Sequence, residues 1–279
     1  MLAYLRRNRS LAVGLGILLL LVLFSVVGRL FWDTDMARPL SGPGSEGPSW
    51  DHPFGTDRQG RDLFAVMIAG TPLTIFIGVL AGLIGVVVGT ILALIAAYYG
   101  GIVDTIIRGV VDIGLTIPPL LVLILLAVSI RSGLTVLQMT LVVASLAWLW
   151  PTRTIRSQVL SLKERAYLQV ARLSGASRMR IIFLELMPNL LPYLAATLVG
   201  TVSAAILASI GLEVIGLGPI ESPTLGMTIY WVNYNSALLH GMWWWFVPPV
   251  AIIILLFVGL FSISAGLDEV ANPRRRRSV

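Results

Sequence analysis

The side chains that most often carry out catalysis are scarce in this chain of 279 residues. It contains 0 Cys, and its two histidines, His52 and His240, stand far apart and lack the spacing of metal ligands. It also lacks a glycine-rich loop ending in Lys-Ser or Lys-Thr, which would hold the phosphates of a nucleotide. We therefore expect no metal site, no nucleotide-binding site and no catalytic residue, so the chain is not expected to be an enzyme.

A few charged or aromatic side chains stand in or beside apolar runs, where ionisable groups are costly and often functional. Asp112 either lines a pathway or contacts another subunit, or it is an interfacial residue paired with Arg108 one helical turn away. Glu213 and Trp231 are candidates to line an outer vestibule. The alternative for these two is an interface anchor and an aromatic residue of the membrane belt.

The composition requires a membrane. The chain is 57% hydrophobic and 12% charged, with a mean hydropathy of +0.89. A soluble domain has about twice that charged fraction. This much apolar surface does not fit inside a water-soluble particle of this size, so a bilayer is its natural solvent. We attribute the net charge of +6 to arginines that anchor the topology, and we expect no nucleic-acid partner.

Apolar runs along the chain predict an all-α integral membrane protein of about six transmembrane helices. The first run follows basic residues, but it is too long for a signal peptide, and no cleavage pattern follows it. We therefore expect an uncleaved first span. The six runs are Leu11–Trp32, about Pro72–Ala97, about Ile106–Ile130, about Leu137–Pro151, about Tyr193–Ile215 and Phe246–Gly266.

Glycines and prolines in these runs predict local structure. Gly100-Gly101 is a turn signal between the second and third runs. Pro118 and Pro119 are expected to kink or break the third span. Small residues at helical spacing in the second run predict a face on which other helices pack closely; these residues are Gly78, Gly82, Gly85 and Gly89.

The charges give the orientation. Basic residues gather before the first run, between the fourth and fifth runs, and in the tail, whereas the loops on the opposite side carry most of the acidic residues. Basic loops stay in the cytoplasm, so we expect both termini there. The resulting organisation is an N-terminal tail and first span (1–32), an extracytoplasmic loop (33–71), a membrane core (72–268) with a cytoplasmic segment at about 152–191, and a basic tail (269–279).

The cytoplasmic segment from Thr152 to Asn189 is the most informative part of the sequence. Apolar residues such as Leu168 and Leu186 recur in it at helical spacing, so we expect a helix–turn–helix with Gly175 near the turn. Its apolar face either docks in a groove of a partner or lies on the bilayer surface. Periodicity alone does not separate these two readings.

The stretch from Tyr167 to Asn189 resembles the coupling-loop motif of ABC importer permeases. That motif runs Glu-Ala-Ala, three residues, Gly, nine residues, an apolar residue, one residue and Leu-Pro. Gly175 and Pro188 have the required separation, and Ala171 matches the second Ala. The chain departs from the motif at Gln169, Val170, Glu185 and Met187.

Four other segments resemble the C-type subunit of the dipeptide/oligopeptide/nickel branch of this family, so the resemblance covers nearly the whole chain. In the first, Arg61 and Asp62 either form a local ion pair or shape the outer mouth. The segments are His52–Asp62, which includes Gly55, Asp57, Gly60, Arg61 and Asp62; Tyr98–Gly101 with Asp104; Arg108–Asp112 followed by Pro118; and Gly216–Gly218 followed by Pro223 and Gly226.

The resemblance implies the type I ABC importer fold and an assembly. This chain would pair with a second homologous permease, two ATP-binding subunits and an extracytoplasmic substrate-binding protein in a bacterial or archaeal inner membrane. ATP and Mg would be bound by the partner subunits, with no cofactor in this chain. Gly175 would form a tight turn, and Pro188 would end the second short helix. Contact with the ATPase would fall to Gln169, Ala171, Gly175, Ala176, Ser177 and Pro188.

The resemblance implies a substrate class, and two other protein classes stay open beside it. Di- or oligopeptides are the first expectation, with oligosaccharides or nickel as alternatives in the same family. A secondary transporter would require inverted repeats and ionisable residues near the membrane midplane, and the chain has few of the latter. A membrane scaffold without a pathway is the third class.

The charge pattern makes a testable prediction of topology. Reporter fusions at Ser278 and at Gly44 are expected to report the cytoplasm and the exterior, respectively, because basic loops are retained inside. The measurement is the activity of paired reporters that work on one side of the membrane only. Reversed signals, or both positions on one side, would contradict the six-span arrangement.

Overall fold

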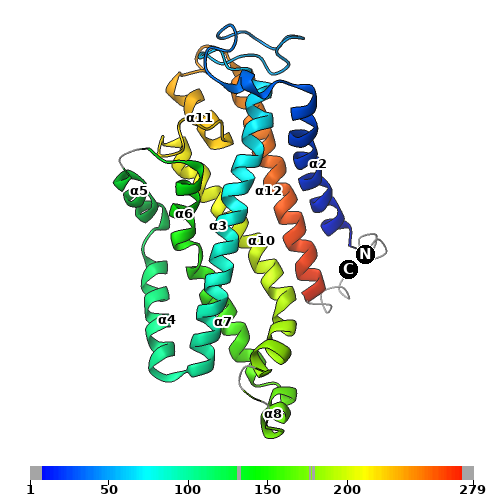
Figure 1. The fold of residues 1–279 in the computed structure, drawn as a ribbon, viewed down its shortest axis with the longest axis vertical. Coiled ribbons are helices and arrows are strands. Elements are labelled where there is room, and N and C mark those ends of the chain that lie inside the picture. Colours follow the sequence, from blue (N-terminus) through cyan, green and yellow to red (C-terminus); the bar gives the residue numbers. More distant parts are fainter. Residues whose placement is uncertain (1–7, 131–132, 176, 178–179, 272–279) are drawn as a thin grey trace.

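The computed structural model describes residues 8–130, 133–175, 177 and 180–271. Within them the chain forms helices and no strand, and the long helices stand side by side in an elongated bundle (Figure 1). Four helical stretches are long and apolar enough to cross a bilayer, namely α2 (Arg9–Phe31), α3 (Leu63–Tyr99), the run Ile181–Val214 and α12 (Trp243–Ala271). The expected all-α membrane fold is confirmed.

The third passage is a broken helix, as the paired prolines predict. It consists of α4 (Gly101–Thr116) and α5 (Pro119–Ser129), which meet at 87°. Ile117 is extended because the ring of a following proline disfavours the helical conformation. Pro119 then occupies the first turn of α5, where its missing N–H is not needed. The bent pair counts as a fifth candidate span.

The fourth passage consists of a short apolar helix and a second, more polar helix that continues past the end expected from hydropathy. The apolar α6 (Val136–Ala147) begins with a capping box between Thr135 and Gln138. After a break at Trp148, α7 (Leu149–Lys163) continues in place of the expected end near Pro151. Twelve residues assigned to the cytoplasmic helix–turn–helix, 152–163, therefore belong to a direct extension of the bundle.

The helix α3 is the central rod of the molecule, and it packs against α2, α6, α7 and α10 (Figure 1). It begins at Leu63, well before the expected start at Pro72, because the Asp62 side chain accepts a hydrogen bond from the Ala65 N–H at 2.7 Å. Pro72 lies inside the helix. At 1.5 Å per residue, its 37 residues extend about 55 Å, far more than a hydrocarbon core of about 30 Å.

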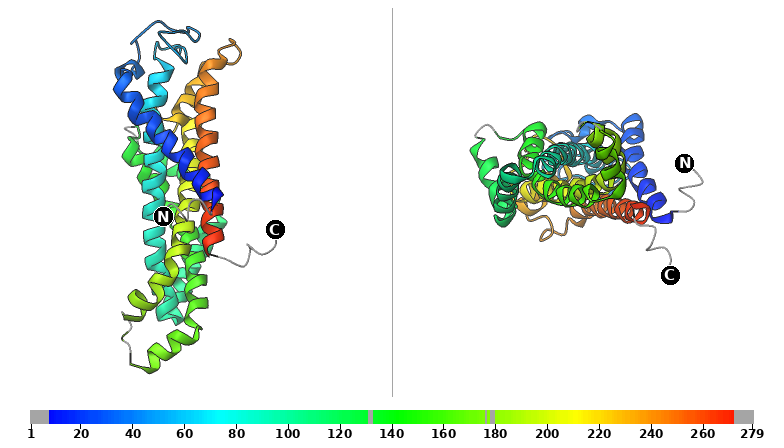
Figure 2. Two further views of the ribbon diagram at one scale, coloured as in Figure 1. Left: turned by 90° about the vertical axis from the view of Figure 1, so that its right-hand side faces the viewer. Right: turned by 90° about the horizontal axis from the view of Figure 1, so that it is seen from below.

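The first and last helices are antiparallel neighbours. The Asn8 side-chain amide donates to the Gly266 carbonyl at 2.8 Å, and Gly14 lies against the backbone of Gly259. The start of α2 is thus beside the end of α12, while α2 leans across the bundle (Figure 2). Both ends of the described chain lie on one side of the bundle, which fits an even number of passages.

The remaining elements cap the two ends of the bundle. The outer loop includes the short 3₁₀ helix η1 (Thr34–Ala37), and α11 (Leu225–Tyr234) lies at the same end. At the other end, α8 (Ala166–Leu173) is followed by the π-helical η2 (Ile181–Leu186) and α10 (Met187–Val214). Most of the functional candidates fall in these two caps, and Asp112 of α4 lies outside them.

The predicted glycine face of α3 is confirmed. A Cβ at Gly82 would stand 2.9 Å from the Val202 nitrogen of α10, and one at Gly85 would stand 2.6 Å from the Ala147 carbonyl oxygen of α6. Further along, Gly89 faces Pro151 of α7. Glycine is required because the neighbouring backbones come so close.

This packing predicts the effect of adding one methyl group. Gly85→Ala is expected to lower the free energy of unfolding by about 1–3 kcal/mol, because the contacted atom is a backbone oxygen that cannot rotate away. The measurement is chemical or thermal unfolding of the detergent-solubilised chain followed by helical circular dichroism.

The matched control is Gly16→Ala in α2, where no atom lies within 4 Å of the added group. Alanine is a better helix former than glycine, so this change should leave stability unaltered or slightly raised. Equal losses from both substitutions would show that α3 does not depend on close packing at Gly85.

Candidate functional site

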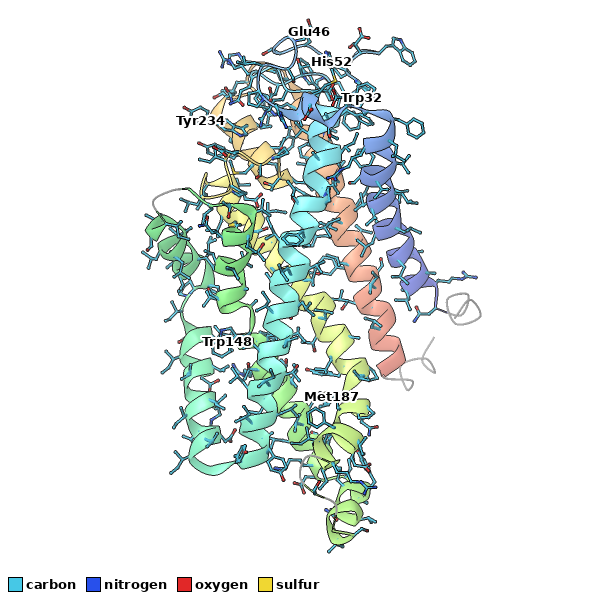
Figure 3. All side chains as sticks on the ribbon, in the orientation of Figure 1. Trp32, Glu46, His52, Trp148, Met187 and Tyr234 are labelled. Carbon is cyan, nitrogen blue, oxygen red and sulfur yellow. The ribbon has the colours of Figure 1, made fainter. Side chains whose placement is uncertain are left out.

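Most of the sequence-predicted residues gather at opposite ends of the bundle, whereas Asp112 lies apart from both groups in α4. Figure 3 shows Glu46 and His52 of the outer loop at one end and Met187 towards the other. We call the first set the outer cluster, which comprises Gly55, Asp57, Gly60, Arg61 and Asp62 with Glu213 and Trp231. The second set, residues 163–190, is the inner segment.

Asp57 organises the turn of the outer loop. Its side chain is fully buried and accepts hydrogen bonds from the N–H groups of Gln59 at 2.8 Å and Arg61 at 2.9 Å. It also accepts from Nε of Arg61 at 2.5 Å. Burial of this carboxylate is tolerated because its oxygens accept hydrogen bonds from two backbone N–H groups and from the cationic guanidinium of Arg61.

Asp62 has a different partner, so Arg61 and Asp62 do not form the local ion pair considered from the sequence. One carboxylate oxygen of Asp62 lies 2.6 Å from Nδ1 of His52, and the other caps α3. His52 and Asp62 are both buried. Two separate acid–base pairs, Asp57–Arg61 and Asp62–His52, therefore hold the loop against the start of α3.

Gly55 and Gly60 have conformations that favour glycine, with φ of +70° and +73°. A Cβ at Gly55 would stand 2.6 Å from the Glu46 carbonyl oxygen and 2.6 Å from Cδ1 of Trp244. The indole of Trp244 also donates to the Thr56 carbonyl at 3.3 Å. The outer loop thus packs against the first turn of α12 and is hydrogen-bonded to it.

The same loop reaches α11 through Arg61. The guanidinium carbon of Arg61 lies 5.7 Å from the centre of the Trp231 ring, a cation–π distance. The other end of α11 is held by Glu213, which is fully buried and accepts from the Thr224 hydroxyl at 2.7 Å. Within this chain, Glu213 and Trp231 fasten α11 to α10 and to the outer loop.

Three tryptophans, Trp243, Trp244 and Trp245, begin α12 and differ in burial. Trp245 is fully buried in a cluster with Leu63, Val232, Ala237 and Met242, although tryptophans at the ends of spans commonly belong to the aromatic belt at the membrane surface. Aromatic rings at span ends fit either role, and hydropathy alone does not distinguish them. Only Trp243 of the three is largely exposed.

In the inner segment, α8 begins at Ala166 and has two dissimilar faces. Leu168 is fully buried in a cluster with residues of α3, α7 and α10, including Ala97, Ile155 and Leu190. On the outward side, Val170 and Leu173 are 62% and 89% exposed. The predicted apolar face is therefore divided between the bundle and the surface.

The turn after α8 has the expected conformation. Gly175 has φ of +77°, and no atom lies within 4 Å of the position where its Cβ would be. Glycine is therefore favoured at this position by the positive φ angle, because a larger side chain would have room there. Gln169 and Ser177 are exposed, and the Ser177 carbonyl accepts from the Ile181 N–H at 3.0 Å. Ala176 and the side chain of Ala171 lie outside the described residues.

The resemblance implied that Pro188 ends the second short helix, and the structure shows that it does not. It lies in the first turn of α10, and the helical run continues from Ile181 to Val214. The preceding π-helical residues shift the hydrogen bonding, so that the Met187 N–H donates to the Ile182 carbonyl. This register accommodates a residue without an N–H and leaves the inner segment continuous with a membrane helix.

One contact here had no signal in the sequence. Nζ of Lys163, at the end of α7, donates to the Ala97 carbonyl near the end of α3 at 2.5 Å. A cation is favourable at a helix C-terminus because the last carbonyls are unpaired. This hydrogen bond joins the ends of α3 and α7, shortly before α8 begins.

The chain is similar to known transport proteins over nearly its whole length. Residues 85–277 match the family model described as the binding-protein-dependent transport system inner membrane component. The chain is 33% identical over 273 residues to a dipeptide transport system permease protein of Bacillus subtilis, an alignment that covers 98% of this chain and 84% of that one. It is 31% identical to the oligopeptide transport system permease protein of the same organism, over 98% and 88% of the two chains.

The outer cluster gives a prediction about stability. Asp57→Asn is expected to lower the free energy of unfolding by about 3–5 kcal/mol, because it leaves the buried Arg61 guanidinium without its counter-charge. The measurement is chemical unfolding in detergent. The control is Asp35→Asn, since the Asp35–Arg38 pair is exposed and such pairs contribute about 0–1 kcal/mol. A loss from Asp57→Asn no larger than the control's would contradict the assigned role.

Proposed function

This chain belongs to the family of binding-protein-dependent transport system inner membrane components, and on that premise we propose that it is a permease subunit of an ATP-driven importer of di- or oligopeptides. In this proposal it forms half of the translocation pathway, beside a second homologous permease. Two ATP-binding subunits dock on its inner segment, and an extracytoplasmic binding protein delivers the substrate. The observation that carries the proposal is the half-exposed apolar helix α8 at the tip of the bundle.

The position of α8 supports docking to a protein over docking to the bilayer. Leu168 of α8 packs in one cluster with Ala93 and Ala97, near the end of α3. Since α3 is about 25 Å longer than a hydrocarbon core, its end lies well beyond the membrane if its start is at the outer surface. Figure 1 accordingly shows α8 far from the start of α2 and the end of α12. A helix that lay in the membrane interface would be at the same height as the start of α2 and the end of α12.

We propose that Val170 and Leu173 enter a cleft of the ATP-binding subunit, and that Gly175 supplies the turn beside it. Gln169, Ala171, Ala176 and Ser177 would line the same contact. Because α8 is anchored through Leu168 to three long helices, movement of the cleft would displace the bundle as a body. Pro188 would contribute through the continuous start of α10.

A cavity of about 630 Å³ supports the assignment of a pathway. It opens among α5, α6, α7 and α10, beside the bend of the third passage. Its polar groups are mainly hydroxyls, such as those of Thr197, Thr201 and Tyr193, and no charged residue is among the described residues that line it. We propose that this surface faces the second permease, and that the binding protein selects the substrate.

The chain is a membrane transport component and not an enzyme, and we propose that ATP and Mg are bound by its partners. Its location would be the inner or plasma membrane, with both termini in the cytoplasm. Oligosaccharides or nickel stay the alternatives for the substrate. The discriminating experiment is uptake of labelled dipeptide, oligosaccharide and nickel by cells with and without this chain.

The docking proposal predicts the effect of a charge on the exposed face of α8. Leu173→Asp is expected to reduce co-purification of the ATP-binding subunits about tenfold or more, since burying an unpaired charge costs a few kcal/mol. Gly175→Val should act in the same direction, through backbone strain of about 1–3 kcal/mol at positive φ. The measurements are pull-down of the ATP-binding subunits and peptide uptake.

The matched control is Leu239→Asp. This side chain is 88% exposed, against 89% for Leu173, and lies at the outer end of the bundle. It should leave co-purification unchanged, and all three variants should insert in the membrane normally. Normal association and uptake in both Leu173→Asp and Gly175→Val would reject the inner segment as the coupling element.

A further inference from the structure

A polar cavity of about 280 Å³ lies between α4 and α7, apart from the pathway and from α8. Three arginines line it, Arg108 from α4 and Arg153 and Arg156 from α7, together with Asp112 and the exposed Ser157. We call this set the arginine pocket. It brings cationic side chains from two helices around one space large enough for a phosphate group.

The carboxylates near the pocket leave it with an excess of positive charge. Asp104 holds Arg156 through two hydrogen bonds, Nε to Oδ1 and Nη2 to Oδ2, each of 2.5 Å. Asp112 lies 3.9 Å from Arg153, and the two side chains are 49% and 59% exposed. Its ion-pair partner is therefore Arg153 and not Arg108, the partner considered from the sequence. Arg108 makes no hydrogen bond or ion pair within the described part of the chain. Three arginines against two carboxylates leave one uncompensated cation.

The pocket lies at the level of the cytoplasmic membrane surface. Figure 3 shows Trp148 between the heights of the start of α2 and the end of α12, where the proposed orientation places the inner surface. Thr152, which lines the pocket, follows one helical turn below Trp148 and donates to its carbonyl. The arginines are thus at the depth of lipid headgroups, and this placement rests on the proposed orientation.

Apolar surface adjoins the pocket on the side of the bilayer. Val110 and Ile113 of α4 are 53% and 66% exposed. In the described chain, α4 buries a single residue, Val111. A ligand with both an anionic group and acyl chains would match this combination and would join α4 to α7.

We propose that the arginine pocket binds the phosphate group of an anionic phospholipid of the cytoplasmic leaflet. The guanidinium groups of Arg108 and Arg153 contact the phosphate oxygens, while Arg156, fixed by Asp104, provides a third cation at the base. Guanidinium groups suit this task because their planar donors match phosphate geometry. The acyl chains lie along Val110 and Ile113. Basic pockets between membrane helices on this side are suited to such headgroups.

The test uses the full-length chain in neutral detergent, titrated with short-chain phosphatidylglycerol, with phosphatidylcholine of the same chains, and with inorganic phosphate. Dissociation constants are measured by microscale thermophoresis. Phosphatidylglycerol should bind, while phosphatidylcholine and inorganic phosphate should bind far more weakly. The double variant Arg108→Gln/Arg153→Gln should bind phosphatidylglycerol about thirtyfold more weakly, about 2 kcal/mol at 25 °C, as expected for two basic residues beside a headgroup. Arg156 is left intact because its pair with Asp104 joins the helices.

Two further variants separate this site from general attraction. Arg9→Gln/Arg165→Gln removes the same charge from exposed positions on the same side and should change the affinity by less than about threefold, because distant charges are screened. Asp112→Asn removes the competing carboxylate and should strengthen binding by about threefold. Circular dichroism confirms that each variant is folded.

Three results would overturn the proposal. Equal weakening by both double variants would show non-specific attraction, and no weakening by the pocket variant would place the lipid elsewhere. Inorganic phosphate that binds as tightly as phosphatidylglycerol, and is lost in the pocket variant, would make the site one for a soluble phosphate. None of these results depends on transport, so the proposed import function is judged separately by uptake.

Discussion

The arrangement of this protein depends on the uninterrupted length of α3. It begins at the Asp62 cap within the outer cluster and ends where Lys163 reaches the Ala97 carbonyl, beside the residues that anchor α8. Its glycines let α6, α7 and α10 approach to backbone contact along the way. A helix has little freedom to compress, so the two ends of the molecule are joined by a rod and not by a chain of loosely packed side chains.

The outer cluster shows why a long extramembrane loop can stay ordered with few apolar residues. Two buried acid–base pairs cross-link it beside a set of backbone hydrogen bonds, and each carboxylate also accepts from one or more backbone N–H groups. Buried charged groups are costly unless they are paired, and here each carboxylate has a basic partner, although Nη2 of Arg61 is buried without a hydrogen bond within the described residues. The loop in turn holds α11 through Trp231, while Glu213 holds its other end. The outer surface that a binding protein would meet is therefore a rigid one.

The sequence predicts the features that follow from local chemistry, and it fails where tertiary contacts decide. The turn at Gly100-Gly101, the break at Pro118 and the positive φ of Gly175 each follow from one or two residues. The early start of α3 was missed because a hydropathy run does not reveal the Asp62 cap, and Pro188 was misread because a π-helical register absorbs it. The partners of Arg61 and Asp62 depend on the fold of the whole loop, which adjacency in sequence does not report.

The distribution of charge bears on the proposed import of peptides. Ionisable side chains concentrate in the outer loop, in the inner segment and in the arginine pocket, whereas the 630 Å³ cavity is lined by apolar, hydroxyl and backbone groups. A fixed charge in a low-dielectric pathway would favour one substrate charge and repel the other by several kcal/mol. Peptides differ in charge, so a permeation surface for many of them should be free of fixed charges. Recognition then belongs outside the membrane, where water lowers the cost of pairing and releasing charged groups.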